Sequence, residues 1–306
     1  MISSSSELSK SGRVDIDSFA DKHGLAKDVL GPACDYMYEL GFLNKEGRTY
    51  SLAENGELLA DVVRGSFYSA AAYTPIFANL EAMIRGEKRY GGEDGRSVER
   101  DTALAAKGSG EAGRVFSFPL VRRLLEERGY RRVLDLGCGD AAFLVDLCSA
   151  NEGFVGYGVD LSEEAIADAE RNIAANGLQG RVHPYAADMF ALERVADDVG
   201  MPEIATSFFG VHELFEQGPD RVHEFFTKFR STFPGVPLML IESARQTPET
   251  IRKRPGPLAE FQLVHDLSRQ HTMSREHWKA LFREAGFSSI EEDYFGMVRI
   301  VVFTVS

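Results

Sequence analysis

RVLDLGCGD, at residues 132–140, carries the clearest structural signal in this chain of 306 residues. Its apolar first half is typical of a buried strand, and its second half is a glycine-rich turn that leads into a predicted helix. Gly137 and Gly139 let the backbone pass close to a ligand, and the first turn of the following helix offers unpaired N–H groups. The stretch therefore predicts a ligand-binding turn at the carboxyl end of a strand.

Strands and helices alternate from this motif onward. Helices of about ten to fifteen residues between the strands indicate crossover connections and a largely parallel sheet. The last two strands are separated only by residues 294–297, so we expect a hairpin that runs antiparallel to the other strands. The predicted fold class is α/β, with a Rossmann-like sheet of seven strands. Strands are predicted at residues 132–136, 155–161, 182–186, 204–210, 237–242, 290–293 and 298–305, and helices at residues 141–150, 162–176, 190–198, 219–231 and 274–285.

The residues before this domain follow another pattern. Residues 14–64 are predicted to form a helix, a turn, a helix and a hairpin, which is the order of a winged helix. Residues 67–85 are predicted as one apolar helix, and the glycine-rich residues 86–113 as a loop over the site. The predicted domains are a winged-helix-like unit for dimerisation and substrate covering at residues 1–90, a linker and connecting helix at residues 91–125, and a cofactor-binding domain at residues 126–306.

Composition and charge narrow the class of partner. The net charge of −13 disfavours binding to the phosphate backbone of a nucleic acid, and the second predicted helix, residues 27–40, is itself acidic. No apolar run is long enough to cross a membrane, and the first ten residues lack the apolar stretch of a signal peptide. We therefore expect a cytoplasmic protein with a small-molecule substrate. We also expect a homodimer joined through the N-terminal domain.

Two carboxylates indicate which ligand the glycine-rich turn binds. Gly137-x-Gly139 alone also fits a dinucleotide fingerprint, but Asp135, just before it, would repel a pyrophosphate. The same carboxylate suits the methionine ammonium group of S-adenosylmethionine (SAM). Asp160 ends the next predicted strand, 21 residues after Gly139, where a carboxylate can accept hydrogen bonds from both ribose hydroxyls. ADMF, residues 187–190, follows the third strand, where an acidic and an apolar side chain can flank adenine.

The three motifs VLDLGCGD, GVDLS and ADMF together resemble those of the class I SAM-dependent methyltransferases, across roughly residues 115–306. Ala141 stands where that family often has a third glycine. The resemblance implies a SAM-dependent methyltransferase with SAM as its cofactor. The cofactor contacts that it implies are those of Asp135, Gly137, Gly139, Asp160, Leu161, Asp188, Met189 and Phe208.

His212 lies in SFFGVHELFE, residues 207–216, which leaves the fourth predicted strand at the edge of the sheet where open α/β folds bind ligands. The acidic Asn/Asp-Pro-Pro-aromatic motif that is typical of amino-group methylation is absent. His212 resembles in its place the catalytic base of plant-type O-methyltransferases, and a neutral imidazole suits proton removal near neutral pH. A loop histidine that caps the following helix is the alternative interpretation.

Two more histidines, His265 and His271, lie in FQLVHDLSRQH, residues 261–271. Residues six apart do not share a helical face, so the two imidazoles can converge only if the helix ends between them. With His212 they would then form a metal site of three histidines with open positions for a substrate. Ordinary polar histidines are the alternative interpretation.

The segments VHELFEQG and FQLVHDLSRQH resemble those of the α-keto acid C-methyltransferases, the group that contains 2-ketoarginine methyltransferase. The resemblance implies methylation of carbon C3 of a 2-oxo acid through an enolate, which a divalent metal ion would stabilise as a Lewis acid. Metal-free O-methylation with His212 as the base stays open, and so does a SAM-binding regulator. The candidate catalytic residues are His212, Glu213 and Asp266, and the candidate metal ligands are His212, His265 and His271.

Overall fold

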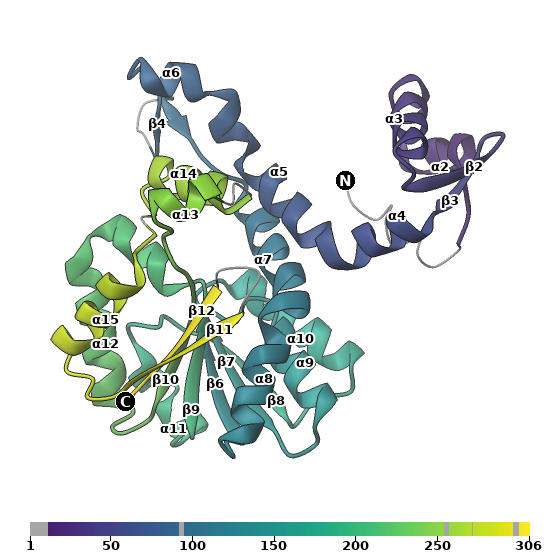
Figure 1. Ribbon diagram of the computed structural model, residues 1–306. Coiled ribbons are helices and arrows are strands. Elements are labelled where there is room, and N and C mark those ends of the chain that lie inside the picture. The colour runs from purple at the N-terminus through teal and green to yellow at the C-terminus, as the bar shows by residue number, and fades with distance from the viewer. Residues whose placement is uncertain (1–11, 92–94, 254–256, 271, 296–299) are drawn as a thin grey trace. The chain divides into compact units, whose positions relative to one another are not determined.

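The computed structural model describes residues 12–91, 95–253, 257–270, 272–295 and 300–306 (Figure 1). Contacts within the chain divide it into two compact units, Met1–Phe67 and Tyr68–Ser306. No helix of the described residues combines the length and the apolar character that crossing a lipid bilayer requires.

The first unit is small and has its own core. Its helices are α2 (Ile16–His23) and α3 (Lys27–Glu39), and β1 (Val14–Asp15), β3 (Thr49–Leu52) and β2 (Leu43–Glu46) form a sheet in that order. The chain then continues through α4 (Glu54–Leu58) and the π-helical η1 (Leu59–Val63). Ile16, Leu43 and Tyr50 form the buried centre. The winged-helix class of this unit and a homodimer formed through it stay predictions.

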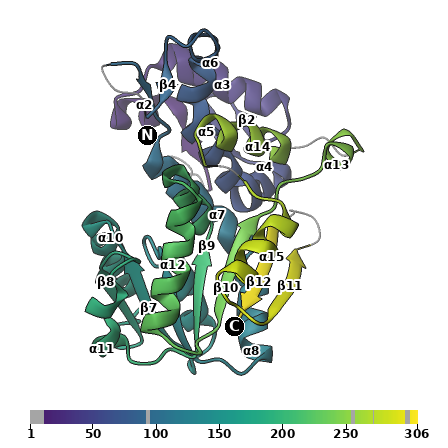
Figure 2. The same ribbon diagram turned by 90° about the vertical axis from the view of Figure 1, so that its left-hand side faces the viewer.

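The second unit is built on a sheet with the strand order β11-β12-β10-β9-β6-β7-β8 (Figures 1 and 2). All seven strands lie where the sequence predicts them, with ends that differ by one or two residues. Strand β9 stops before Phe209, whose positive φ of 53° turns the chain out of the sheet. The strands are β6 (Arg132–Leu136), β7 (Val155–Asp160), β8 (Val182–Ala186), β9 (Ile204–Phe208), β10 (Leu238–Ser243), β11 (Ile290–Phe295) and β12 (Ile300–Val305).

The expected direction of the two closing strands is wrong for one of them. Strand β12 pairs antiparallel with both β10 and β11, so it lies between them. Strand β11 therefore runs in the same direction as the other strands, and β12 alone is reversed. The short connection predicts a hairpin correctly, but it does not show which of its strands joins the sheet.

Helices cover both faces of the sheet (Figures 1 and 2). One face packs against α8 (Phe118–Glu127), α9 (Ala142–Ala150) and α10 (Glu163–Ala175), and the other against α12 (Pro219–Thr232) and α15 (Arg275–Glu284). Neighbouring residues of β6 serve both layers, because Val133 faces the first and Leu134 the second. The helix predicted at residues 190–198 is instead two short ones, the 3₁₀-helix η2 (Leu192–Arg194) and α11 (Ala196–Val199).

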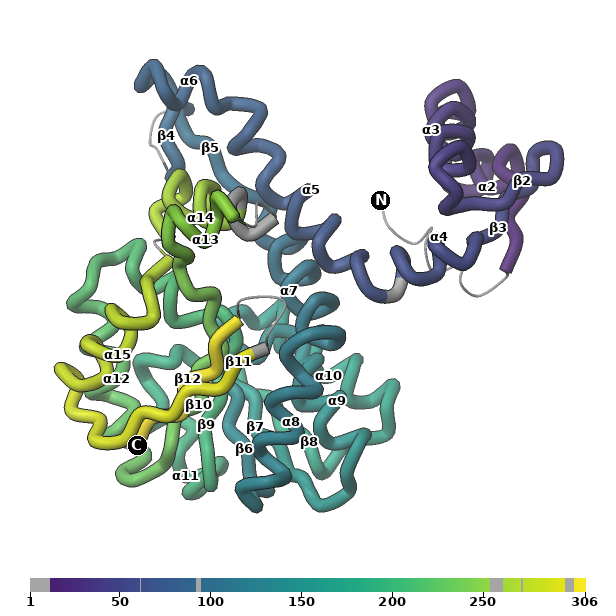
Figure 3. Tube along the Cα trace, in the orientation of Figure 1, coloured from purple at the N-terminus to yellow at the C-terminus, as the bar shows by residue number. Residues whose placement is uncertain are grey.

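Residues 68–116 also belong to the second unit (Figure 3). The stretch 68–90, which the sequence assigns to the first domain, contributes Tyr73 and Ile76 to a core shared with Val98 and Val264. The loop predicted at residues 86–113 is wrong in its second half, where Asp101 caps a helix by accepting from the amide of Leu104. The elements here are α5 (Arg64–Ala78), α6 (Leu80–Ile84), β4 (Arg89–Tyr90), β5 (Ser97–Val98) and α7 (Thr102–Phe116).

Three elements at the carboxyl ends of β9 and β10 complete the unit. The 3₁₀-helix η3 (Val211–Gln217) follows β9, and α13 (Pro248–Lys253) and α14 (Pro257–Leu267) follow β10. Helix α14 ends between His265 and His271, as the sequence requires for the two to converge. Arg269, with a φ of 62°, is the left-handed residue after this end, and the amide of Gln270 donates to the carbonyl of His265 at 2.9 Å.

Gly158→Ala should destabilise the protein by about 1–3 kcal/mol, because a Cβ there would lie 2.7 Å from Sγ of Cys138 in the glycine-rich turn. Gly110→Ala is the matched control: its Cβ would meet no atom within 4 Å, and alanine favours the helix by about 0.5–1 kcal/mol. Urea denaturation of both variants measures the difference. Equal stability of the two would contradict this packing of β7 against the turn.

Candidate active site

The glycine-rich turn is fixed by the end of the neighbouring strand. The amides of Gly137 and Cys138 both donate to the carbonyl of Val159, at 2.8 and 3.1 Å. Gly137 and Gly139 have φ values of 76° and 55°, in the left-handed region that favours glycine. Ala141 has a φ of 57° as well, so a residue with a Cβ adopts this conformation directly before α9.

Asp160 joins the end of β7 to this turn. Its Oδ2 accepts a hydrogen bond from the amide of Gly139 at 2.9 Å, and its Oδ1 accepts one from the amide of Ser162 at 2.9 Å. Each carboxylate oxygen keeps a second lone pair, so the side chain can still accept two hydroxyl groups. Leu161, next to it, exposes 74% of its surface. A carboxylate acceptor beside an exposed apolar side chain suits a nucleoside: the carboxylate can bind the ribose hydroxyls, and the apolar side chain can contact the base.

Asp135 is buried on β6, where the hydroxyl of Thr206 donates to its Oδ1 at 2.7 Å. Burial raises the pKa of Asp135 to about 7, while the hydrogen bond from Thr206 lowers it and the negative charge of Asp160 adds to the rise. A cationic ligand would strongly stabilise the charged form of this carboxylate, because its positive charge replaces the hydration that burial removes.

The other three predicted cofactor residues are arranged less directly. Asp188 accepts from the amide of Phe190 at 2.8 Å, and this bond fixes the loop after β8. Met189 is half-buried against the core. The ring of Phe208 packs against those of Phe118 and Phe143, with centroid distances of 5.2 and 4.5 Å. Phe208 is thus part of an aromatic cluster at the end of β9.

The position of His212 is fixed by a buried carboxylate on the next strand of the chain. Oε1 of Glu242, in β10, accepts from the amide of His212 at 3.2 Å, and Oε2 lies 2.8 Å from the ring nitrogen Nδ1. Both side chains are almost fully buried. Burial alone would lower the pKa of His212, but the charge and the hydrogen bond of Glu242 raise it above its ordinary value. The arrangement makes Nδ1 the donor and leaves Nε2 for other partners.

His265 faces His212, with ring centroids 5.2 Å apart. Nδ1 of His265 lies 2.7 Å from the carbonyl oxygen of Phe261, so this nitrogen carries the hydrogen and donates it. Burial, followed by the charge of His212, lowers the pKa of His265 to about 3. His265 is therefore neutral at physiological pH, with the lone pair on Nε2.

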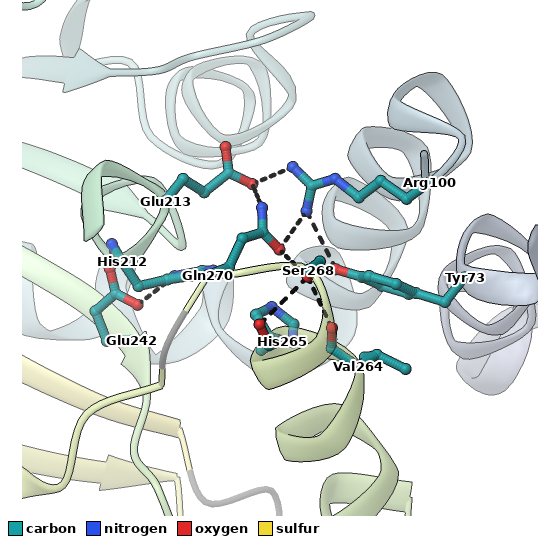
Figure 4. A network of polar contacts seen from close by, with 9 residues as sticks. All are labelled: Tyr73, Arg100, His212, Glu213, Glu242, Val264, His265, Ser268 and Gln270. Atoms are coloured by element: carbon teal, nitrogen blue, oxygen red, sulfur yellow. Dashed lines mark hydrogen bonds and ion pairs between the residues drawn. The ribbon is translucent and has the colours of Figure 1, made fainter. Parts of the chain in front are cut away.

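A polar network lies beside the two histidines (Figure 4). The guanidinium of Arg100 donates through Nη2 to Glu213 at 2.6 Å, and through Nη1 to Gln270 at 2.8 Å and to the hydroxyl of Tyr73 at 3.1 Å. Gln270 also donates to Glu213, at 3.2 Å. The ring of Tyr73 lies 5.7 Å from that of His265, which connects the network to the histidine pair.

The remaining predicted residues divide into two cases. Both carboxylate oxygens of Asp266 accept from Arg245, each at 2.8 Å, so this side chain is engaged in a bidentate ion pair. His271 lies outside the described residues. Among the residues that are described, no group of three or more histidine, cysteine or acidic side chains is arranged to hold a metal ion. Of the predicted metal ligands, the structure brings His212 and His265 together.

Three site residues are not predicted by the sequence. Glu242 is predicted only as the end of a strand, although a carboxylate that ends an otherwise apolar strand is a usable signal. Arg100 lies in a run of charged residues, and nothing in that run distinguishes it. Gln270 is placed by the left-handed turn at Arg269, which a sequence without glycine there does not indicate.

The affinity for the cofactor should depend on pH through Asp135. If its carboxylate holds the ammonium group, binding requires the charged form, which predominates above a pKa of about 7. The affinity for S-adenosylhomocysteine should therefore rise between about pH 5.5 and 7.5, with proton release at the acidic end. Calorimetry in two buffers of different ionisation enthalpy measures both quantities.

Asp135→Asn should weaken this binding and abolish its pH dependence. Asp168→Asn, on the exposed face of α10, is the control and should keep both. A pH dependence that survives in Asp135→Asn would show that another group binds the ammonium.

Comparisons with known proteins agree with this geometry. Residues 128–201, which include the glycine-rich turn and Asp160, match a family described as a methyltransferase domain. The chain is 26% identical to 2-ketoarginine methyltransferase of Streptomyces arginensis over 259 residues, which are 82% of this chain and 72% of that protein. It is 26% identical to indolepyruvate C-methyltransferase of Streptomyces griseus over 231 residues, which are 72% of this chain and 67% of that protein.

Solved structures share the fold. Human N-acetylserotonin methyltransferase in complex with SAM has a TM-score of 0.62 at 15% identity, with coverage of 96% of this chain and 87% of that one. An O-methyltransferase described as putative, from Nostoc punctiforme, has a TM-score of 0.66 at 17% identity, with coverage of 95% and 88%. Together with the methyltransferase-domain match and the two relatives, they identify the chain as a SAM-dependent methyltransferase with the class I fold.

Proposed function

We propose that this chain transfers the methyl group of SAM to carbon C3 of a small 2-oxo acid. Two relatives that align over most of the chain support this, since the names of both, 2-ketoarginine methyltransferase and indolepyruvate C-methyltransferase, refer to 2-oxo acids. The segments that carry the resemblance, residues 211–218 and 261–271, include the histidine pair.

The histidine pair is the observation on which this proposal depends. His212 and His265 each use Nδ1 for a fixed acceptor, a carboxylate in one case and a carbonyl in the other. Histidines that bind metal ions are oriented in the same way, with the second nitrogen directed at the ion. The two described donors therefore fit a divalent ion, with His271 as the proposed third ligand. Such an ion would act as a Lewis acid towards the 2-oxo acid and favour its enolate.

SAM supplies the methyl group, and its sulfur keeps the electrons of the bond that breaks. Loss of a proton from C3 gives the enolate, whose C3 forms the new bond to the methyl carbon. The carbon–sulfur bond breaks, and the sulfur keeps the electron pair, so the products are the 3-methyl-2-oxo acid and S-adenosylhomocysteine. Asp266 and Glu213 are both engaged with arginines, but each carboxylate keeps lone pairs that can accept this proton. The site contributes chiefly by holding the two carbons in line.

A substrate panel tests the proposal. The pure protein is incubated with SAM and with a series of 2-oxo acids, phenols and carboxylic acids, and mass spectrometry identifies which of them gains a methyl group and where. His265→Ala should abolish turnover and leave S-adenosylhomocysteine binding unchanged. His223→Ala, a partly exposed histidine of α12, is the matched control and should retain activity.

The outcomes separate clearly. Methylation at C3 of a 2-oxo acid that depends on His265 supports the proposal. Methylation of phenols alone, or full activity of His265→Ala, would reject it.

Metal-free O-methylation is a second candidate, favoured by the contact between His212 and Glu242. An imidazole whose Nδ1 donates to a buried carboxylate has a more basic Nε2, which suits removal of a hydroxyl proton. This candidate needs neither His265 nor a metal ion.

Glu242→Gln distinguishes the two candidates. If His212 is a base, the rate of methyl transfer rises with pH as the imidazole loses its proton. Loss of the carboxylate lowers the pKa of His212, so this rise should move to lower pH while the maximal rate falls about 10- to 100-fold.

If His212 holds a metal ion, the same variant should instead lose bound metal, which elemental analysis of the pure protein measures. Glu292→Gln, in the largely buried ion pair with Lys279, is the control for the loss of a carboxylate and should change neither quantity.

A further inference from the structure

The chain segment around Arg100 is anchored to neighbouring elements. It follows β5 and precedes α7, and the amide of its neighbour Asp101 donates to the carbonyl of Ala72 in α5 at 2.9 Å. The side chain of Asp101 caps α7 by accepting from the amide of Leu104. The guanidinium therefore extends from an anchored segment, and only 12% of the side chain is exposed.

The hydrogen bonds of this guanidinium are incomplete. Nη1 donates to Tyr73 and Gln270, and Nη2 donates to Glu213. Nε is buried and has no hydrogen-bond partner among the described residues. A buried N–H without an acceptor costs free energy, so its presence beside a reaction site indicates that a ligand supplies the acceptor.

A second buried hydroxyl without a hydrogen-bond partner lies close to Gln270 in the sequence. Oγ1 of Thr272, two residues after Gln270, is also buried without a partner among the described residues. Gln270 itself is held between Arg100 and Glu213. Within the network, the Nε–H group of Arg100 therefore has no acceptor, and an anion could supply one.

The ion pair with Glu213 does not use the whole cation. A guanidinium has five N–H groups in a fork and can serve two carboxylates at once. Oε1 of Glu213 also accepts from Gln270, so this carboxylate does not depend on Arg100 alone. The network also lies beside the histidines, because the ring of Tyr73 is 5.7 Å from that of His265.

We propose that Arg100 binds the carboxylate of the anionic substrate through Nε and Nη2, and that Tyr73 and Gln270 position it. A chain with a net charge of −13 needs a local cation to attract an acid, and a guanidinium recognises a carboxylate with two hydrogen bonds. This inference rests on the proposed 2-oxo acid substrate. It assigns substrate recognition to a residue that lies far in sequence from every cofactor motif.

Arg100→Gln and Arg100→Lys test this assignment. We expect Arg100→Gln to raise the KM for the 2-oxo acid about 10- to 100-fold, with a smaller change in kcat and an unchanged affinity for S-adenosylhomocysteine. Arg100→Lys should restore part of the affinity, because it keeps the charge without the fork. Arg122→Gln breaks the half-buried pair with Asp146 between α8 and α9 and is the matched control, with an expected KM close to that of the wild type.

An uncharged analogue separates recognition from structure. The wild type should bind the 2-oxo acid more tightly than the corresponding 2-oxo amide, and Arg100→Gln should bind the two about equally. A preference for the acid that survives in Arg100→Gln would overturn the assignment and leave Arg100 as a structural ion pair. If Arg100→Gln fails to bind S-adenosylhomocysteine, the lysine variant decides: a weakened but persistent preference supports the assignment, and an unchanged KM overturns it.

Failure of the proposed function would look different. The wild type would then methylate no 2-oxo acid, whereas calorimetry of its S-adenosylhomocysteine complex with small carboxylates would still report on Arg100. Binding that is lost in Arg100→Gln would support the anion site for another acid, and equal binding by both proteins would overturn it.

Discussion

The buried carboxylate of Glu242 is the contact that organises the candidate active site. It lies near the end of β10, and its two oxygens bind the backbone and the ring of His212, thirty residues earlier in the chain. A charge at this depth is tolerated only with such partners, so the 3₁₀-helix after β9 is tied to the end of β10. The tie fixes which nitrogen of His212 carries hydrogen. It also sets where the facing His265, and through it the network of Arg100, must lie.

The fold follows from local patterns in most places. Residues 132–136 form the strand that their apolar run predicts, and the alternation of strands with helices gives the parallel sheet. The position of β12 is not local information, because a short connection predicts a hairpin and not which strand pairs with β10. The helix at residues 102–116 is not predicted, because its glycines mask a good cap at Asp101.

The candidate site divides in the same way. Asp135, Gly139 and Asp160 come from one motif and the strand beside it, so their spacing in the sequence is enough to predict that they lie close together. Their contacts with the cofactor stay predictions. Arg100 bonds to partners that are 113 and 170 residues away, and such contacts leave no trace in a single sequence. Asp266 lies between two histidines in the sequence, which suggests chemistry, and the structure pairs it with Arg245. Its catalytic role stays a prediction.

Among the described residues, Ala141, Phe209 and Arg269 have positive φ without being glycine, and each lies at the edge of the site. One precedes the helix beside the cofactor turn, one precedes the loop of His212, and one places Gln270. Such a conformation costs roughly 1 kcal/mol at each position, against a net stability of about 5–15 kcal/mol for a typical domain. The aromatic layer between the sheet and helices α12 and α15 must offset that cost. Engineering for heat resistance that relaxes these three backbones would therefore trade catalytic geometry for robustness, whereas filling out that layer would not.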